Sequence, residues 1–144
     1  MLPKLLLAFS LMAVSVTVHA IALAAAFRYV ERQESTGVTR FWNAAWLLTR
    51  VAGWSILSHL LQIFTWGSVY AAAGAIRDLA SAFYFSAVTY TTTGYGDLVL
   101  PQQWRVVGGI EALTGILMCG LSTGLFFGVF ARVAGIIAPT APAQ

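Results

Sequence analysis

The chain has 144 residues, of which 59% are hydrophobic and only 9% are charged, and its mean hydropathy is +0.80. A soluble domain carries about a quarter charged residues to cover its surface, so this composition excludes an ordinary water-soluble globule and indicates a membrane protein. One cysteine and two histidines exclude a disulfide framework and predict no metal cluster, and a net charge of +3 without a basic run predicts no nucleic-acid partner.

The first uncharged stretch long enough to cross a bilayer runs from Leu5 to Phe27, since about 20 apolar helical residues span the hydrocarbon core. A Val-His-Ala sequence ending at Ala20 is compatible with a signal-peptide cleavage site. The apolar run continues past Ala20, which favours a retained helix. This stretch has no arginine at every third position, so it is not expected to be a voltage sensor.

Two further spans are expected, from Val51 to Tyr70 and from Val106 to Ala131. Trp46 and Trp66 lie 20 residues apart, which is about 30 Å along a helix and suits two interfacial belts. The third span contains a single charged residue, Glu111, and six glycines, a composition typical of close helix packing in lipid.

The segment between these spans, residues 78–103, is too short to cross the membrane twice as full helices. Asp78 is a suitable N-cap for a short helix from Leu79 to about Tyr90, whose apolar body includes Tyr84 and Phe85. The Thr- and Gly-rich stretch that follows must be irregular. Irregular backbone is tolerated at membrane depth only where protein buries it or it lines water, so we expect a re-entrant half-helix and a strand along an aqueous pore.

The stretch from Thr89 to Asp97 reads Thr-Tyr-Thr-Thr-Thr-Gly-Tyr-Gly-Asp and closely resembles the signature of tetrameric potassium channels, with Thr93 where valine is commonest. The resemblance covers the outer helix, pore helix, filter and inner helix, roughly residues 46–132. It implies an all-α membrane protein with three transmembrane helices, a re-entrant pore helix and an extended selectivity filter, assembled as a homotetramer in lipid. It also implies passive conduction of K⁺, with no enzyme activity and no organic cofactor.

By this resemblance, four chains meet on one axis and stack rings of oxygen that replace the hydration shell of K⁺. The ligands would be the carbonyls of Thr92, Thr93, Gly94 and Tyr95, together with the Thr92 hydroxyl. Successive carbonyls can face one way only if alternate residues take unusual backbone angles, which suits Gly94 and Gly96.

The resemblance also assigns roles around the filter. Tyr95 would point away from the axis toward pore-helix aromatics, but Phe85 stands where familiar members have a hydrogen-bonding tryptophan, which leaves the rigidity behind the filter open. Asp97 would form a ring of carboxylates at the outer mouth, or pin the loop by a hydrogen bond, and the two roles are compatible.

Glu111 falls about 140° from Ile116 on a helical wheel, away from the expected cavity. We expect its side chain to be buried against protein, with His59 or a pore-helix hydroxyl such as Thr89 as its partner, and to brace the filter from behind. The alternative is a protonated Glu111 in a polar pocket and a His59 that only packs.

The inner helix is expected to line the cavity with one helical stripe, in which Thr123 and Phe127 form the cytoplasmic constriction. Gly115 aligns with the family's hinge glycine, although helix packing would equally explain it. The full stripe consists of Ile116, Cys119, Gly120, Thr123 and Phe127.

We therefore expect residues 1–44 to form an N-terminal transmembrane helix and a cytoplasmic loop, residues 45–137 the pore domain, and residues 138–144 a short cytoplasmic tail. The N-terminus would lie outside an inner or plasma membrane. Two alternatives stay open: a non-selective cation channel, which Thr93 permits, and a non-conducting membrane subunit with the pore fold. This topology places Lys4, Arg77 and Arg105 outside and Arg28, Arg32, Arg40, Arg50 and Arg132 inside.

Overall fold

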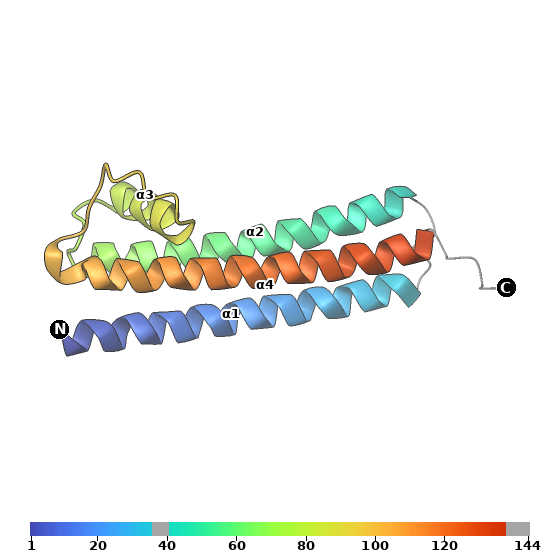
Figure 1. Ribbon diagram of the computed structural model, residues 1–144, viewed down its shortest axis with the longest axis horizontal. Coiled ribbons are helices and arrows are strands. Elements are labelled where there is room, and N and C mark those ends of the chain that lie inside the picture. The colour runs from blue at the N-terminus through green and yellow to red at the C-terminus, as the bar shows by residue number, and fades with distance from the viewer. Residues whose placement is uncertain (36–40, 138–144) are drawn as a thin grey trace.

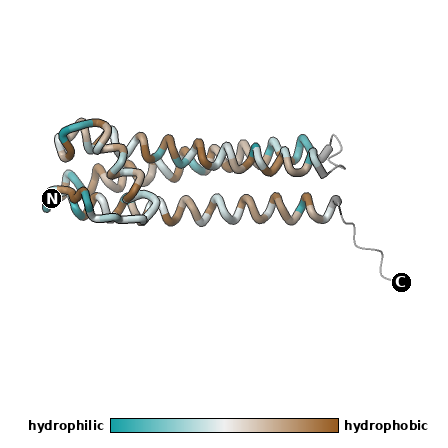
Figure 2. Tube along the Cα trace, turned by 90° about the horizontal axis from the view of Figure 1, so that it is seen from above, coloured by the Kyte–Doolittle hydropathy of each residue, from teal (hydrophilic) through white to brown (hydrophobic). Residues whose placement is uncertain are grey.

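The computed structural model describes residues 1–35 and 41–137, and these residues form helices without any strand. Three helices are long and apolar enough to cross a membrane, and hydrophobic residues predominate along them (Figure 2). The expected all-α fold with three spans and a half-length helix is confirmed, whereas the predicted tail, residues 138–144, lies outside the described residues. The elements are α1 (Leu2–Ser35), α2 (Phe41–Ala72), α3 (Leu79–Tyr90), η1 (Gln102–Trp104) and α4 (Arg105–Ile137).

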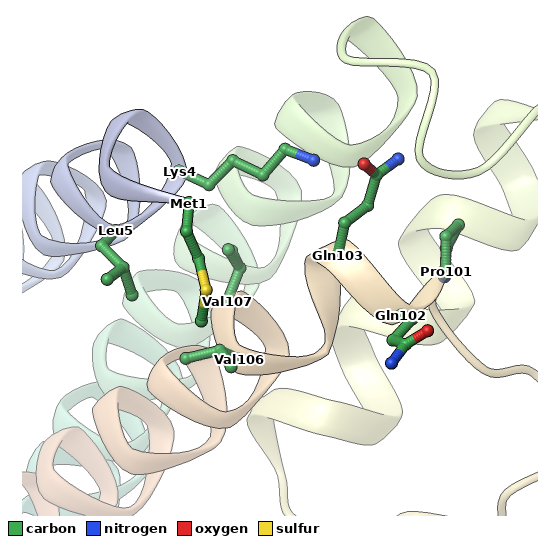
Figure 3. Close-up of a pocket in the computed structure, with 8 residues that line it drawn as sticks. All are labelled: Met1, Lys4, Leu5, Pro101, Gln102, Gln103, Val106 and Val107. Atoms are coloured by element: carbon green, nitrogen blue, oxygen red, sulfur yellow. The ribbon is translucent and has the colours of Figure 1, made fainter.

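The three long helices run side by side, and α3 packs against α2 and α4 at one end of them (Figure 1). The start of α1 lies at this same end, on the other side of α4 from α3. There, Lys4 places its ammonium 4.7 Å from the centre of the Trp104 ring. A pocket of about 650 Å³ separates the first turn of α1 from Pro101, Gln102 and Gln103 (Figure 3).

Helices α1 and α2 extend well beyond the spans expected from hydropathy. Helix α1 continues to Ser35, and α2 begins at Phe41 rather than near Val51. Hydropathy marks only the part of a helix inside hydrocarbon, whereas backbone hydrogen bonding continues through polar residues such as Arg50. Residues 28–35 and 41–44, which the sequence placed outside the first two spans, are therefore helical, and residues 36–40 lie outside the described ranges.

Of the two predicted belt residues, Trp46 lies on the surface of the chain and Trp66 does not, and their depth in a membrane stays a prediction. Trp46 is exposed, as a belt residue should be, but Trp66 is fully buried and donates its indole N–H to Ser15 Oγ at 3.2 Å. Helix α1 covers this face of α2. Trp66 therefore belongs to the hydrophobic core that lies beneath α3, together with Tyr70, Ala82, Leu100, Trp104 and Val107.

Helix α3 begins and ends where the sequence predicts. The Asp78 carboxylate accepts a hydrogen bond from the Ser81 N–H at 2.8 Å, which caps the helix and lowers the pKa of Asp78. Two glycines let α3 approach its neighbours closely. A Cβ at Gly67 of α2 would fall 2.5 Å from the Phe83 ring, and one at Gly115 of α4 would fall 1.8 Å from the Tyr90 carbonyl oxygen.

This contact revises the expectation for Gly115. Helix α4 is continuous through Gly115, and the absent side chain makes room for the last residue of the pore helix. A change at Gly115 therefore acts directly on Tyr90, which lies shortly before the Thr- and Gly-rich loop.

We predict that Gly115→Ala destabilises the fold by about 1–3 kcal/mol, because the added methyl must push α3 away from α4. Thermal unfolding in detergent micelles measures this cost. Gly109→Ala is the matched control, since a Cβ there meets nothing within 4 Å and alanine favours a helix. Equal melting temperatures for the two variants would contradict the close approach at Gly115.

Candidate functional site

The loop after α3 has an alternating backbone. Thr92, Gly94 and Gly96 have positive φ angles of 58°, 55° and 78°, and Thr92 is the one non-glycine residue with positive φ in the described ranges. Left-handed angles at every second residue turn successive carbonyls toward the same side. The sequence expectation for Gly94 and Gly96 is met, and Thr92 extends the alternation by one step.

The amides of this loop point back toward the pore helix. The N–H groups of Thr93 and Gly94 both donate to the Val88 carbonyl, at 2.9 and 3.2 Å, and that of Thr92 donates to the Thr89 carbonyl at 2.9 Å. Within residues 1–35 and 41–137, the carbonyls of residues 92–95 accept no hydrogen bond. Such carbonyls are costly at membrane depth unless water or an ion contacts them.

The Thr93 hydroxyl is satisfied inside the loop. Thr91 Oγ1 donates to the Ala87 carbonyl at 2.7 Å and lies 2.9 Å from Thr93 Oγ1. Because the single Thr91 proton is used, Thr93 must donate to Thr91. The threonine that replaces the usual valine therefore adds no unpaired hydroxyl to the loop.

Tyr84 and Asp97 fasten the outer end of the loop. The Tyr84 hydroxyl donates to Asp97 Oδ2 at 2.6 Å, and the Leu98 N–H donates to Oδ1 at 3.0 Å. The bond from Tyr84 lowers the pKa of Asp97 and raises that of Tyr84. The expected pinning role of Asp97 is therefore present in a single chain, while a ring of four carboxylates stays a prediction about the assembly.

Among the described residues, no pore-helix aromatic ring packs against Tyr95. Its side chain is 71% exposed. Phe85 instead packs edge-on against Tyr70 at 5.4 Å between ring centres. A cavity of about 120 Å³ lies between the pore helix and the loop, bordered by Phe85, Val88 and Gly94. Packing of Tyr95 against pore-helix aromatics thus stays a prediction that needs a second chain.

Glu111 is fully buried, as expected, and joins three helices. Tyr70 of α2 donates to its Oε2 at 2.7 Å, and Ser86 Oγ of α3 lies 2.5 Å from its Oε1. Ser86 Oγ also lies 2.8 Å from the Ile63 carbonyl, and its one proton cannot serve both oxygens. A protonated Glu111 that donates to Ser86 satisfies every group, and it avoids an uncompensated buried charge. The structure therefore favours a neutral Glu111.

The pairing of Glu111 with His59 is wrong. His59 contacts Tyr90 Oη at 3.1 Å and Ser122 Oγ at 3.0 Å. The sequence also offered a pore-helix hydroxyl such as Thr89 as the partner of Glu111. The partner is indeed a pore-helix hydroxyl, but it belongs to Ser86 rather than to Thr89.

The predicted cavity stripe of α4 faces away from the rest of the chain. Ile116 is 59% and Phe127 is 70% exposed, while Glu111 on another face is buried. This stripe is therefore available to other copies of the chain or to lipid, and its role in a cavity stays a prediction. The stripe residues, all exposed, are Ile116, Cys119, Gly120, Thr123 and Phe127.

Several residues that position the loop were not predicted from the sequence. Nothing in the sequence around Gly67 indicated its close contact with α3. Tyr70 was predicted only as the last residue of the second span. Buried polar residues inside apolar helices were the available signal, because such residues normally find partners. Those missed are Ser58, Gln62, Ser86, Tyr90 and Ser122, all buried, and His19, whose partners the sequence left open.

A half-length helix and an alternating glycine loop between two apolar helices define a pore-loop membrane protein. A family described as "Ion channel" matches residues 15–132, which is most of the chain. The chain therefore belongs to this ion channel family, in agreement with the resemblance found in the sequence.

Two curated relatives are named as potassium channels. The potassium voltage-gated channel protein Shal of Drosophila melanogaster is 37% identical over 58 residues, which are 39% of this chain and 10% of Shal. The potassium voltage-gated channel protein shk-1 of Caenorhabditis elegans is 39% identical over 66 residues, which are 42% of this chain and 12% of shk-1. The chain thus spans only about a tenth of the length of these relatives. No solved structure matches it.

We predict that Glu111→Gln preserves stability, whereas Glu111→Ala costs about 3 kcal/mol. Glutamine reproduces a protonated carboxyl, because its amide can donate to Ser86 while its oxygen accepts from Tyr70. Thermal unfolding in lipid nanodiscs compares the variants, with the exposed Glu31→Gln as control. If Glu111→Gln were as damaging as Glu111→Ala, the neutral state of Glu111 would be refuted.

We predict that Tyr84→Phe raises the pKa of Asp97 toward its ordinary value, because the hydrogen bond that favours the carboxylate is lost. In the unaltered chain the charged, pinned state is present at neutral pH and is lost only as the pH falls through the lowered pKa. A ¹³C titration of the Asp97 carboxyl measures the shift. Tyr29→Phe, which removes a hydroxyl bonded to Arg50, should leave the Asp97 titration unchanged.

Proposed function

We propose that the chain is one subunit of a potassium-selective channel, which conducts K⁺ passively through a filter formed by residues 92–96 of four copies. The observation that carries this proposal is the alternating backbone at Thr92, Gly94 and Gly96, which leaves the carbonyls of residues 92–95 without hydrogen bonds from the described residues. Stacked carbonyl rings are the chemistry that replaces the hydration shell of K⁺. The two relatives named as potassium channels support the same ion.

A homotetramer follows from the same chemistry, because one chain supplies one oxygen to each layer and cyclic symmetry closes a ring with identical contacts. The exposed surface of the chain supports this assembly. Tyr95, Ile116 and Phe127 are all large, hydrophobic and exposed in one chain. Copies around an axis, together with membrane lipid, would cover such residues.

The orientation proposed is an extracellular filter, with the N-terminus on the same side and the C-terminal tail in the cytoplasm. Figure 1 shows the start of α1 at the end of the molecule that carries α3. The cations divide between the two ends as the positive-inside tendency requires. Lys4, Arg77 and Arg105 lie toward the filter end and Arg28, Arg32, Arg50 and Arg132 toward the other, while Arg40 is outside the described residues.

The decisive experiment is ion flux through purified protein in liposomes. K⁺ and Rb⁺ should pass, and Na⁺ should be largely excluded. Ba²⁺ should block, because its radius resembles that of K⁺ while its doubled charge binds the carbonyl rings too tightly. Equal Na⁺ and K⁺ flux would favour the non-selective cation channel, and absence of flux would favour the non-conducting subunit.

Gly94→Ala is the matched variant, since an alanine at a φ of +55° is strained and should abolish selective flux. Gly109→Ala, whose added Cβ meets open space, should conduct normally. Native mass measurement of the same preparations should give four subunits. A stable dimer would contradict the assembly.

A further inference from the structure

Both histidines of the chain meet in one buried polar cluster beneath the pore helix, although they stand 40 residues apart. The His19 and His59 rings lie 5.0 Å apart between centres. His19 comes from α1, His59 and Gln62 from α2, Tyr90 from α3 and Ser122 from α4. Four helices therefore contribute to a cluster in which all members except His59 are buried.

The hydrogen bonds of this cluster form a closed ring when each proton is counted once. Tyr90 donates to Gln62 Oε1 at 2.9 Å, so its oxygen accepts from His59 Nδ1 at 3.1 Å. A neutral His59 must then accept at Nε2 from Ser122 Oγ at 3.0 Å. Ser122 in turn accepts from His19 Nε2 at 2.9 Å, and His19 Nδ1 accepts from Gln62 Nε2 at 3.2 Å.

The ring fixes the protonation of both imidazoles. His19 carries its proton on Nε2 and His59 carries its proton on Nδ1, so the two histidines are opposite tautomers. Neither has a free lone pair. An added proton converts an accepting nitrogen into a donor, which then faces another donor: Gln62 Nε2 beside His19, or the Ser122 hydroxyl beside His59. Each added proton therefore breaks a link of the ring.

The surroundings of the two imidazoles both repel and accept an added proton. His59 of α2 faces His19 directly, so a second cation would be repelled. Ser58 Oγ lies 3.0 Å from His19 Nδ1, and the Met118 carbonyl of α4 is a further acceptor for His19. Cys119 and Glu111 of α4 also act electrostatically on Tyr90 of α3, and Glu111 is engaged by Tyr70 and Ser86.

Tyr90 connects this ring to the filter. It is the last residue of α3, its carbonyl oxygen packs on Gly115, and the next residues, Thr91 and Thr92, begin the filter loop. Its hydroxyl takes part in two links of the ring. An added proton leaves both of these links in place, but it removes a support from one of the two residues that hold Tyr90: Gln62 loses its bond to His19, or His59 loses its bond to Ser122.

We propose that His19 and His59 form a proton-binding site that regulates the pore: one added proton opens the hydrogen-bonded ring, weakens the support of the residues that hold Tyr90 and lowers conduction. The regulation rests on the proposed channel function, whereas proton binding by the ring does not. The conducting state is present while both imidazoles are neutral and is lost as the pH falls through the range in which histidine titrates, about pH 8 to 5.

The proton site is tested without any flux, by ¹⁵N NMR of histidine-labelled protein in lipid nanodiscs. At about pH 8 the spectrum should show one Nε2–H and one Nδ1–H tautomer. His59→Asn, which leaves a single histidine, assigns the Nε2–H signal to His19. Two identical tautomers, or two independent titrations like those of free imidazole, would overturn the ring.

The regulation is tested by K⁺ flux at about pH 8 and about pH 5. Acidification should lower flux about tenfold, because the loss of roughly one hydrogen bond changes the population of the conducting state by about that factor. His19→Gln keeps a donor toward Ser122, and His59→Asn keeps a donor toward Tyr90, but neither residue binds a proton. The double variant should conduct at both pH values with little difference between them.

Ser15→Ala is the matched control, because it removes another α1–α2 hydrogen bond, to Trp66, outside the ring. Its pH dependence should equal that of the unaltered chain. A pH response that persists in the double variant would refute the regulation. Absence of flux from the unaltered chain at both pH values would refute the channel function instead, and the NMR tautomers would still decide whether the proton site exists.

Discussion

The carbonyls of residues 92–95 accept no hydrogen bond from the part of the chain that the structure describes, and this row is the constraint on which the rest of the structure depends. Such a row is costly in a membrane, and it also needs Thr92 at a φ of 58°, a conformation that costs about 1–3 kcal/mol in a non-glycine residue. Backbone of this kind persists only when its surroundings hold it from several sides. Here Val88 accepts two amides at its base, and the Tyr84–Asp97 pair holds its outer end.

The surrounding support is concentrated on one face of α3. Ala82, Ser86 and Tyr90 are buried and recur every four residues, so they form a single stripe facing α2 and α4. Ala82 allows close packing, Ser86 meets Glu111, and Tyr90 enters the histidine ring. Burial of polar groups is favourable only when all of them are paired. The polar groups around Glu111 meet this condition when Glu111 is neutral. Those of the histidine ring meet it when both histidines are neutral.

Much of this architecture could be predicted from the sequence. The bounds of α3, the three spans and the alternating loop follow from hydropathy, capping and glycine spacing, which are local properties. The partners of buried polar residues could not be predicted, because hydroxyls such as Ser86 and Tyr70 carry no periodic signal and are chosen by tertiary contact. The pairing of His59 with Glu111 failed for the same reason, because the partners of His59, Tyr90 and Ser122, come from other helices and are far away in the sequence.

Helix α1 is therefore part of the pore's support rather than a separate anchor. Lipid tails are as apolar as leucine, so helices in a membrane gain little from hydrophobic contact with one another and depend on packing and polar contacts. Helix α1 makes such contacts along its length, from Lys4 over Trp104, from Ser15 to Trp66 and from His19 to Ser122. The contact of His19 belongs to the ring that holds Tyr90. The family match begins at residue 15, so Ser15 and His19 both lie within the matched region.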